Sequence, residues 1–269
     1  HVSFDCSVKV TKAYSTSFST AVKMLAPTIR QDIYNIYGFV RFADEIVDTF
    51  HGYDKEKLLL DFKNQTYEAI SAGISLNPIL NSFQWAVNKY QIPMELIDTF
   101  LDSMEMDLQK QTYDQGKYET YILGSAEVVG LMCLKVFVNG NDEKYEELKH
   151  SAMRLGSAFQ KVNFLRDLKA DYEDLSRTYF PNTNLNELDE ISKQVIIAEI
   201  EADFAAGFEG IQKLKDGMKR HLYKVKYGNQ ALENAHLWMM IIIPLQFICV
   251  SGCFCTATSG WAKKSTAWK

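Results

Sequence analysis

The chain has 269 residues, of which 47% are hydrophobic, 13% aromatic and 23% charged. This globular composition supplies ample apolar material for a core and excludes intrinsic disorder and collagen-like repeats. The 29 lysine and arginine residues are outnumbered by 34 aspartate and glutamate residues, which gives a net charge of −5. A general nucleic-acid binder shows the opposite balance, so we expect no nucleic-acid partner. Clustered carboxylates suit the binding of divalent cations instead.

The cysteines and the two ends of the chain bear on where the protein works. Five cysteines spread over a long chain predict a reducing compartment and no disulfide framework. Residues 1–13 contain no unbroken hydrophobic stretch, so we expect no signal peptide and a cytoplasmic location. Residues 237–255 are apolar and long enough to span a membrane, although Pro244 and Gln246 weaken that assignment. A buried helix is the favoured interpretation of this stretch, with a tail anchor or an interfacial helix as the alternative.

From residue 29 onward the pattern is helical. Apolar residues recur at three- and four-residue spacing without strand-like alternation, and only five prolines interrupt the whole chain. Short polar or glycine-containing joints separate the predicted helices, and no repeat or long linker is present. The helices are expected at residues 29–49, 53–71, 81–90, 94–110, 118–138, 143–175 and 188–219. The sequence therefore predicts a single all-α domain over residues 1–269.

The first predicted helix carries a polar stripe in apolar surroundings. Tyr34, Tyr37, Arg41, Asp44 and Asp48 follow one another at three- or four-residue steps, so a helix places them on one face. The two aspartates are one turn apart and can share a cation. Apolar residues flank the stripe on both sides, which is unusual for a solvent-exposed helix.

A second polar stripe lies in the helix predicted at residues 143–175. It consists of Gly156, Gln160, Asn163, Asp167 and Asp171, with Arg166 beside it and Arg177 downstream. One aspartate pair on a helix is more often a solvated acidic face. Here the pattern occurs twice, each time with an arginine and with apolar flanks. Two such helices facing one another across a cavity would hold Mg²⁺ and bind diphosphates through the arginines.

These motifs resemble those of the squalene and phytoene synthase family of head-to-head prenyl transferases, and most of all its bacterial phytoene synthases. The segments that carry the resemblance are residues 14–18 (YSTSF), 37–48 (YGFVRFADEIVD), 163–171 (NFLRDLKAD) and 177–181 (RTYFP). The similarity covers roughly residues 4–208. Many relatives carry a second aspartate where Glu45 stands, and the chain after about Leu214 departs from the family pattern.

The resemblance implies an isoprenoid synthase-type helical bundle around a central cavity that takes two prenyl diphosphates. The implied Mg²⁺ ligands, with Mn²⁺ as an alternative metal, are Asp44, Asp48, Asn163, Asp167 and Asp171. The implied catalytic residues are the same four aspartates together with Tyr37 and Tyr121. The implied substrate-binding residues are Ser15, Ser17, Phe18, Arg41, Gln160, Asn163, Arg166 and Arg177.

The resemblance further implies the condensation of two geranylgeranyl diphosphates to phytoene, the first step of carotenoid biosynthesis, without NADPH. A dehydrosqualene or squalene synthase that uses farnesyl diphosphate is the first alternative. A terpene cyclase or chain-elongating enzyme and a non-catalytic helical assembly protein are the others. Because a forty-carbon product must leave into lipid, we expect peripheral membrane association. The oligomeric state stays open.

Overall fold

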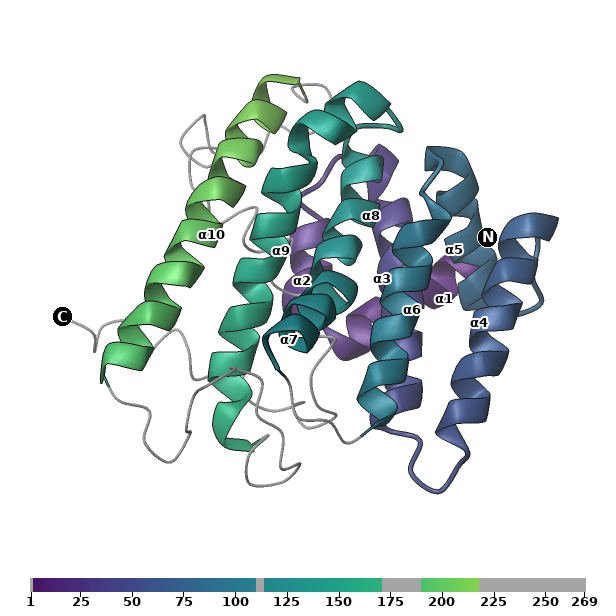
Figure 1. Ribbon diagram of the computed structural model, residues 1–269. Coiled ribbons are helices and arrows are strands. Elements are labelled where there is room, and N and C mark those ends of the chain that lie inside the picture. Colours follow the sequence, from purple (N-terminus) through teal and green to yellow (C-terminus); the bar gives the residue numbers. More distant parts are fainter. Residues whose placement is uncertain (1, 110–113, 171–189, 218–269) are drawn as a thin grey trace.

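The computed structural model describes residues 2–109, 114–170 and 190–217, and for 166–170, 190–192 and 215–217 it describes the backbone alone. Within these ranges the chain forms helices and short connections and no strand (Figure 1). The predicted all-α class is therefore confirmed. The elements are α1 (Val2–Tyr14), α2 (Thr16–Val22), α3 (Pro27–Asp48), α4 (Lys55–Ala72), α5 (Pro78–Tyr90), α6 (Met94–Leu108), α7 (Gln115–Ile122), the π-helical turn η1 (Leu123–Glu127), α8 (Val128–Phe137), α9 (Asp142–Ala170) and α10 (Glu190–Gly217).

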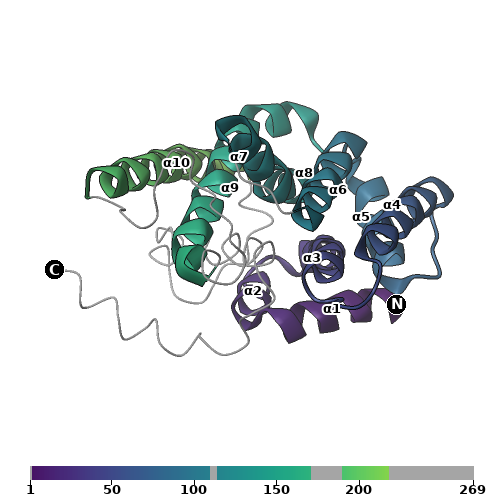
Figure 2. The same cartoon turned by 60° about the horizontal axis from the view of Figure 1, so that its bottom comes forward.

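Helix α3 lies at the centre of the N-terminal half. It packs against α1, α5, α4, α6 and α8, and in Figure 2 it is seen nearly end-on between α1 and α6. Its residues from Asp32 to Val40 are all buried. Phe39 anchors it, with its ring stacked on Phe83 at a centroid distance of 3.8 Å and on Phe62 at 5.6 Å. Such aromatic contacts bury large apolar areas and fix the helix in the core.

The helix ends follow local capping rules. Asn77 precedes α5, and its Oδ1 accepts hydrogen bonds from the backbone N–H groups of Ile79 and Leu80. Pro78, the first residue of α5, has no N–H that would need a partner. Gly73 ends α4 with a φ of 69°, a left-handed conformation that glycine adopts without steric cost.

The C-terminal half pairs long helices. Helix α10 packs along α9, and α9 packs on its other side against α8 and η1 (Figure 1). The stretch Gln115–Phe137 is apolar and long enough to cross a membrane, but 78% of its most apolar window is buried inside the fold. A core helix of a soluble protein has the same properties. The predicted apolar stretch 237–255 lies outside the described residues.

Two features differ from the predicted helices. Helices α1 and α2 precede the first predicted helix, and the helix predicted at residues 118–138 contains the π turn η1. The helices predicted at 143–175 and 188–219 are present as α9 and α10, and their remaining predicted residues lie outside the described part. The polar stripes therefore lie on α3 and α9, two helices on either side of α8.

Candidate active site

The acidic end of α3 carries a buried ion network. The Arg41 guanidinium pairs with the Asp44 carboxylate, and its Nη2 donates to Glu45 Oε2 at 2.6 Å. Asp44 is only 1% exposed, whereas Asp48, one turn further on, is partly exposed. The face thus presents one buried and one partly exposed carboxylate with an arginine beside them.

Burial is the main cause that raises the pKa of Asp44 well above its usual range, and the negative charge of Asp48 adds to it. Arg41 opposes the shift, while the charges of Asp107 and Glu45 increase it. A carboxylate in such surroundings needs more positive charge than one arginine supplies. Two oxygen donors one helical turn apart are suited to a hard divalent cation, so these residues fit the predicted Mg²⁺.

The corner between α1 and α2 packs against this face of α3. Ser15 caps α2 by accepting a hydrogen bond from the Phe18 backbone N–H at 3.2 Å, and it lies close to Tyr37. Phe18 stacks on Tyr37 with a centroid distance of 4.6 Å. Ser17 is exposed, with its Oγ 3.4 Å from that of Ser15. The structure therefore brings the predicted residues of the YSTSF segment together with the α3 stripe.

Tyr14 belongs to the same corner and was not among the predicted site residues. The Arg41 guanidinium lies 4.2 Å from the centre of the Tyr14 ring, a cation–π contact. Burial raises the pKa of the Tyr14 hydroxyl, and the negative charge of the nearby Glu45 adds to the shift. Tyr14 thereby packs on Arg41 from the α1 side, and its ring is half exposed at the edge of the site.

Asp107, near the end of α6, is a second residue that the sequence reasoning missed. The Tyr121 hydroxyl on α7 donates to Asp107 Oδ2 at 3.0 Å. The Asp107 carboxylate is close enough for its charge to raise the pKa of Asp44. In the sequence it is one acidic residue in the run DSMEMD, with no partner at helical spacing to mark it. Its role depends on the packing of α6 against α3, which the sequence does not display.

Helix α9 contributes two buried amides. Gln160 is fully buried and Asn163 nearly so, and Asn163 Nδ2 donates to Gln160 Oε1 at 3.5 Å. Within the described residues the Gln160 Nε2 group is buried without a hydrogen-bond partner. A buried donor in this state is costly unless a ligand accepts its hydrogen bond. Gln160 is therefore suited to an anionic or polar ligand.

The remaining predicted residues are only partly described. Arg166 and Asp167 lie within α9, but their side chains are outside the described part, and Asp171 and Arg177 fall outside it altogether. Among the side chains that are described, no three Asp, Glu, His or Cys groups gather into a metal-binding cluster. The predicted cation site thus rests on the Asp44 and Asp48 pair together with ligands that this structure leaves undescribed.

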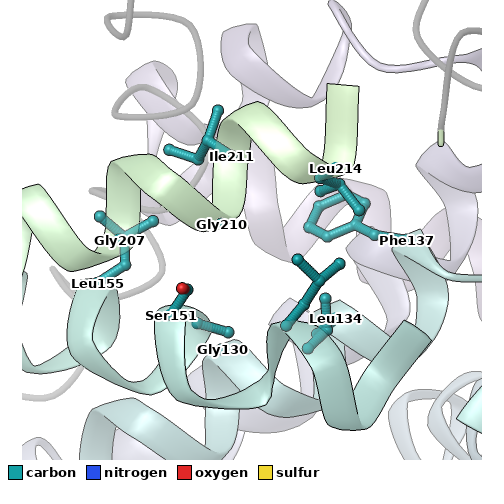
Figure 3. Close-up of a pocket in the computed structure, with 11 residues that line it drawn as sticks. Gly130, Leu134, Phe137, Ser151, Leu155, Gly207, Gly210, Ile211 and Leu214 are labelled. Atoms are coloured by element: carbon teal, nitrogen blue, oxygen red, sulfur yellow. The ribbon is translucent and has the colours of Figure 1, made fainter. Parts of the chain in front are cut away.

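An apolar recess lies between α8, α9 and α10 and shares no residue with the polar site. Figure 3 shows Leu134, Phe137 and Leu214 among the residues that line it, with Gly207 and Gly210 on the α10 strip above α9. A Cβ at Gly207 would lie 2.8 Å from Leu155 Cβ. The glycines of α10 therefore let the two helices approach closely.

A buried charge cluster ties α10 to α9 beside the amides. Lys161 Nζ donates to Asp203 Oδ2 at 2.9 Å and also pairs with Glu199, and Arg154 pairs with the other oxygen of Asp203. The Asp203 side chain is 0% exposed and that of Lys161 5%. Buried charges are tolerated when they are paired in this way.

Glu127 of η1 faces the same cluster, and its titration should mark the pH dependence of stability. Burial raises the pKa of Glu127 to about 7, although the positive charge of Arg154 lowers it; Asp203 and Lys161 have smaller effects that raise and lower it, respectively. A raised pKa in the folded state favours the folded protein at low pH, and this contribution is lost as pH rises from about 4.5 to about 7. Because the carboxyl is partly exposed, we expect a loss of about 1–2 kcal/mol.

The variant Glu127→Gln cannot titrate. We expect its free energy of unfolding, relative to the unsubstituted chain, to rise by about 1–2 kcal/mol between pH 5 and pH 8 in urea titrations. Taking the difference between the two proteins at each pH cancels the titration of all other groups. A difference that stays constant over this range would contradict the assignment.

Comparisons with known proteins define the class. Residues 11–226 match the squalene/phytoene synthase family model, so the chain belongs to the squalene/phytoene synthase family. This confirms the family resemblance, and the match continues past Leu214, where the sequence pattern itself no longer aligned. The squalene synthase HpnC from Alicyclobacillus acidocaldarius has the same fold, with a TM-score of 0.71 and 19% identity over 92% of this chain and 91% of that one. The isoprenoid synthase-type fold is thereby confirmed.

Two curated relatives are similar in sequence. The 4,4'-diapophytoene synthase of Staphylococcus haemolyticus is 31% identical over 183 residues, which are 66% of this chain and 62% of the relative. The presqualene diphosphate synthase of Zymomonas mobilis is 32% identical over 186 residues, 68% of this chain and 62% of the relative. The chain thus spans about three fifths of the length of these relatives.

Proposed function

We propose that this chain catalyses the Mg²⁺-dependent head-to-head condensation of two prenyl diphosphates, with geranylgeranyl diphosphate as substrate and phytoene as product. The observation that carries the proposal is the buried Asp44 carboxylate, one turn from Asp48 and paired with Arg41, on a helix whose neighbouring faces are apolar and aromatic. A chain of this family with that arrangement has both a place for charged headgroups and a dry environment for the reacting carbons.

The reaction proceeds through two ionisations. The first diphosphate departs with the bonding electron pair and leaves an allylic cation, which the alkene of the second substrate attacks with loss of a proton to give a cyclopropylcarbinyl diphosphate. Loss of the second diphosphate, rearrangement and release of a proton then give the linear triene. When bound, Mg²⁺ neutralises the charge of the departing diphosphate.

The residues of the chain have distinct tasks in this scheme. Asp44 and Asp48 would hold the cation, with Asn163, Asp167 and Asp171 as the further ligands, and Arg41, Arg166 and Arg177 would bind phosphate oxygens. Gln160 Nε2 offers a buried donor to the substrate. The stacked rings of Phe18 and Tyr37 exclude water and present aromatic faces to a carbocation.

A second candidate is the formation of dehydrosqualene from farnesyl diphosphate. The specific observation in its favour is the 31% identity with a 4,4'-diapophytoene synthase. The chemistry and the site residues are the same, and only the chain length of the substrate differs. Neither candidate requires NADPH.

The product and the net charge of the chain bear on where the enzyme works and on its partners. A hydrocarbon product of either length partitions into lipid, so we propose a cytoplasmic enzyme associated with the membrane surface. The excess of acidic residues argues against a nucleic-acid partner.

The test is to incubate the purified chain with Mg²⁺ and either geranylgeranyl or farnesyl diphosphate, without NADPH, and to identify extracted products by mass spectrometry. We expect phytoene from the twenty-carbon substrate. Dehydrosqualene from the fifteen-carbon substrate alone would establish the second candidate. A cyclopropylcarbinyl diphosphate as the only product would limit the activity to the first half-reaction, and no product from a folded protein would refute the proposal.

A further inference from the structure

The long helix formed by α7, η1 and α8 contains a π-helical turn next to the candidate active site. At this turn the Val128 N–H bonds to the Leu123 carbonyl, five residues back. Such a turn accommodates one extra residue, and single π turns of this kind often accompany functional sites. Since one residue corresponds to about 100° of helix rotation, the turn resets the direction of the α7 side chains relative to those of α8.

Two glycines, Gly124 within the π turn and Gly156 on α9, allow neighbouring helices to pack closely against the turn. On the α6 side, a Cβ at Gly124 would lie 2.6 Å from Ser103 Cβ and 2.8 Å from the Thr99 carbonyl oxygen. On the α9 side, a Cβ at Gly156 would lie 3.1 Å from Glu127 Cα and 3.2 Å from the Ala126 carbonyl oxygen. The backbone of η1 therefore lies directly against Gly156 of α9, and a Cβ there would require a shift of a few tenths of an ångström.

A side-chain hydrogen bond connects the turn to Tyr121. The Ser125 hydroxyl donates to the Tyr121 carbonyl at 2.7 Å, and Tyr121 in turn donates its own hydroxyl to Asp107 at 3.0 Å. Tyr121 also packs against Phe164 of α9, with a centroid distance of 6.1 Å. Gly156 begins the same α9 stripe that carries Gln160 and Asn163, so its contact with η1 contributes to the spacing between α9 and the helix that bears Tyr121.

We propose that the close contact between Gly156 and the π turn positions the Tyr121 hydroxyl on Asp107. This hydrogen bond then holds the Asp107 carboxylate of α6 in place beside α3. In this proposal Gly156 is a positioning residue, because it acts through Tyr121. Its consequence for turnover rests on the proposed condensation, whereas its consequence for the geometry of Tyr121 does not.

The substitution that tests this is Gly156→Ala, which adds one methyl group at the contact. Gly130→Ala is the matched control, because a Cβ at Gly130 of α8 would lie at an ordinary 3.5 Å from the Ala152 carbonyl oxygen of the same α9 partner. In protein labelled with ¹³C at the tyrosine Cζ, the Tyr121 resonance is assigned by its loss in Tyr121→Phe. We expect that resonance to shift in Gly156→Ala and to stay in place in Gly130→Ala.

Turnover gives the second readout. We expect kcat to fall about 10- to 100-fold in Gly156→Ala with KM changed by less than about threefold, and to stay within about twofold of the unsubstituted enzyme in Gly130→Ala. Tyr121→Phe should lower kcat in the unsubstituted background and have almost no further effect in the Gly156→Ala background. A merely structural role of Gly156 would leave the effect of Tyr121→Phe unchanged.

The outcomes separate the two proposals. The inference is overturned if the Tyr121 resonance does not shift in folded Gly156→Ala. It is also overturned if Tyr121→Phe lowers kcat by the same factor in the Gly156→Ala background as in the unsubstituted enzyme. If the unsubstituted chain shows no turnover, the proposed function fails while the resonance still decides the inference. If Gly156→Ala does not fold, Ser125→Ala, which adds no volume and removes the bond to the Tyr121 carbonyl, must shift the Tyr121 resonance for the inference to stand.

Discussion

The variant Asp44→Asn is expected to lose turnover by about 10³-fold or more while its fold and its stability without metal are retained. The loss follows because an amide oxygen is a weak ligand for the cation and leaves the diphosphate charge uncompensated. Stability is retained because burial already raises the pKa of Asp44, so that its charge is costly in the folded state and a neutral isostere removes that cost. Product formation and thermal unfolding, each with and without Mg²⁺, measure both effects.

A buried aspartate at the other end of the same helix is the matched control. Asp32 is 3% exposed and accepts from Lys89 Nζ at 2.7 Å and from the Tyr90 hydroxyl at 2.8 Å, so it joins α3 to α5. Asp32→Asn should lose about 1–3 kcal/mol of stability because a charge-assisted bond is lost, and should keep its kcat. Near-normal turnover in Asp44→Asn, or an equal loss in both variants, would remove Asp44 from the metal site.

The helices and their polar stripes were predictable because they are local. Tyr37, Arg41, Asp44 and Asp48 belong to one helix, and the period of 3.6 residues alone places them on one face. The α3 and α6 boundaries lie within two residues of the predicted ones, whereas α5 begins at Pro78, three residues before its predicted start, because proline is favoured in the first turn of a helix. What the stripe faces, in contrast, depends on contacts between distant segments.

Helix α1 shows why some of the fold escaped prediction. Its inward face is made of small polar residues, so it lacks the apolar period that identified the other helices. Ser7 is buried with its hydroxyl 2.6 Å from that of Ser82, and the Thr11 hydroxyl donates to the Ser7 carbonyl. Gly38 of α3 leaves room for Ser7, because a Cβ there would lie 2.8 Å from the Ser7 hydroxyl oxygen. Close packing through small residues has no hydrophobic signature in the sequence.

Asp107 and the π turn are long-range features of the same kind. A single aspartate gains its role from Tyr121 and from the proximity of α3, and neither relation has a fixed spacing in the chain. Gln115–Phe137 is long and apolar throughout, so its mean hydropathy does not reveal the extra residue of η1, and the segment is typical of one uninterrupted helix. The candidate site was thus predictable where one helix builds it, and not where two helices meet.

Lys161→Met is the substitution for which we expect the largest loss of stability. Lys161 and Arg154 together balance the fully buried Asp203, and Lys161 also pairs with Glu199. Removing one partner of a buried ion pair leaves an uncompensated charge and costs about 3–5 kcal/mol. For a domain of this size that corresponds to a fall in Tm of about 6–15 °C.

An exposed pair supplies the control for that measurement. Lys63 pairs with Asp102 at 2.6 Å, but their side chains are 25% and 62% exposed, so Lys63→Met should cost less than about 1 kcal/mol. A double-mutant cycle measures the coupling. The loss of unfolding free energy in the double variant Lys161→Met/Asp203→Asn should be about 1–3 kcal/mol smaller than the sum of the losses in the two single variants, because each substitution removes the charge that the other leaves unpaired. Equal losses for Lys161→Met and Lys63→Met would mean that burial does not govern the α9 and α10 contact, and that water screens the charge cluster.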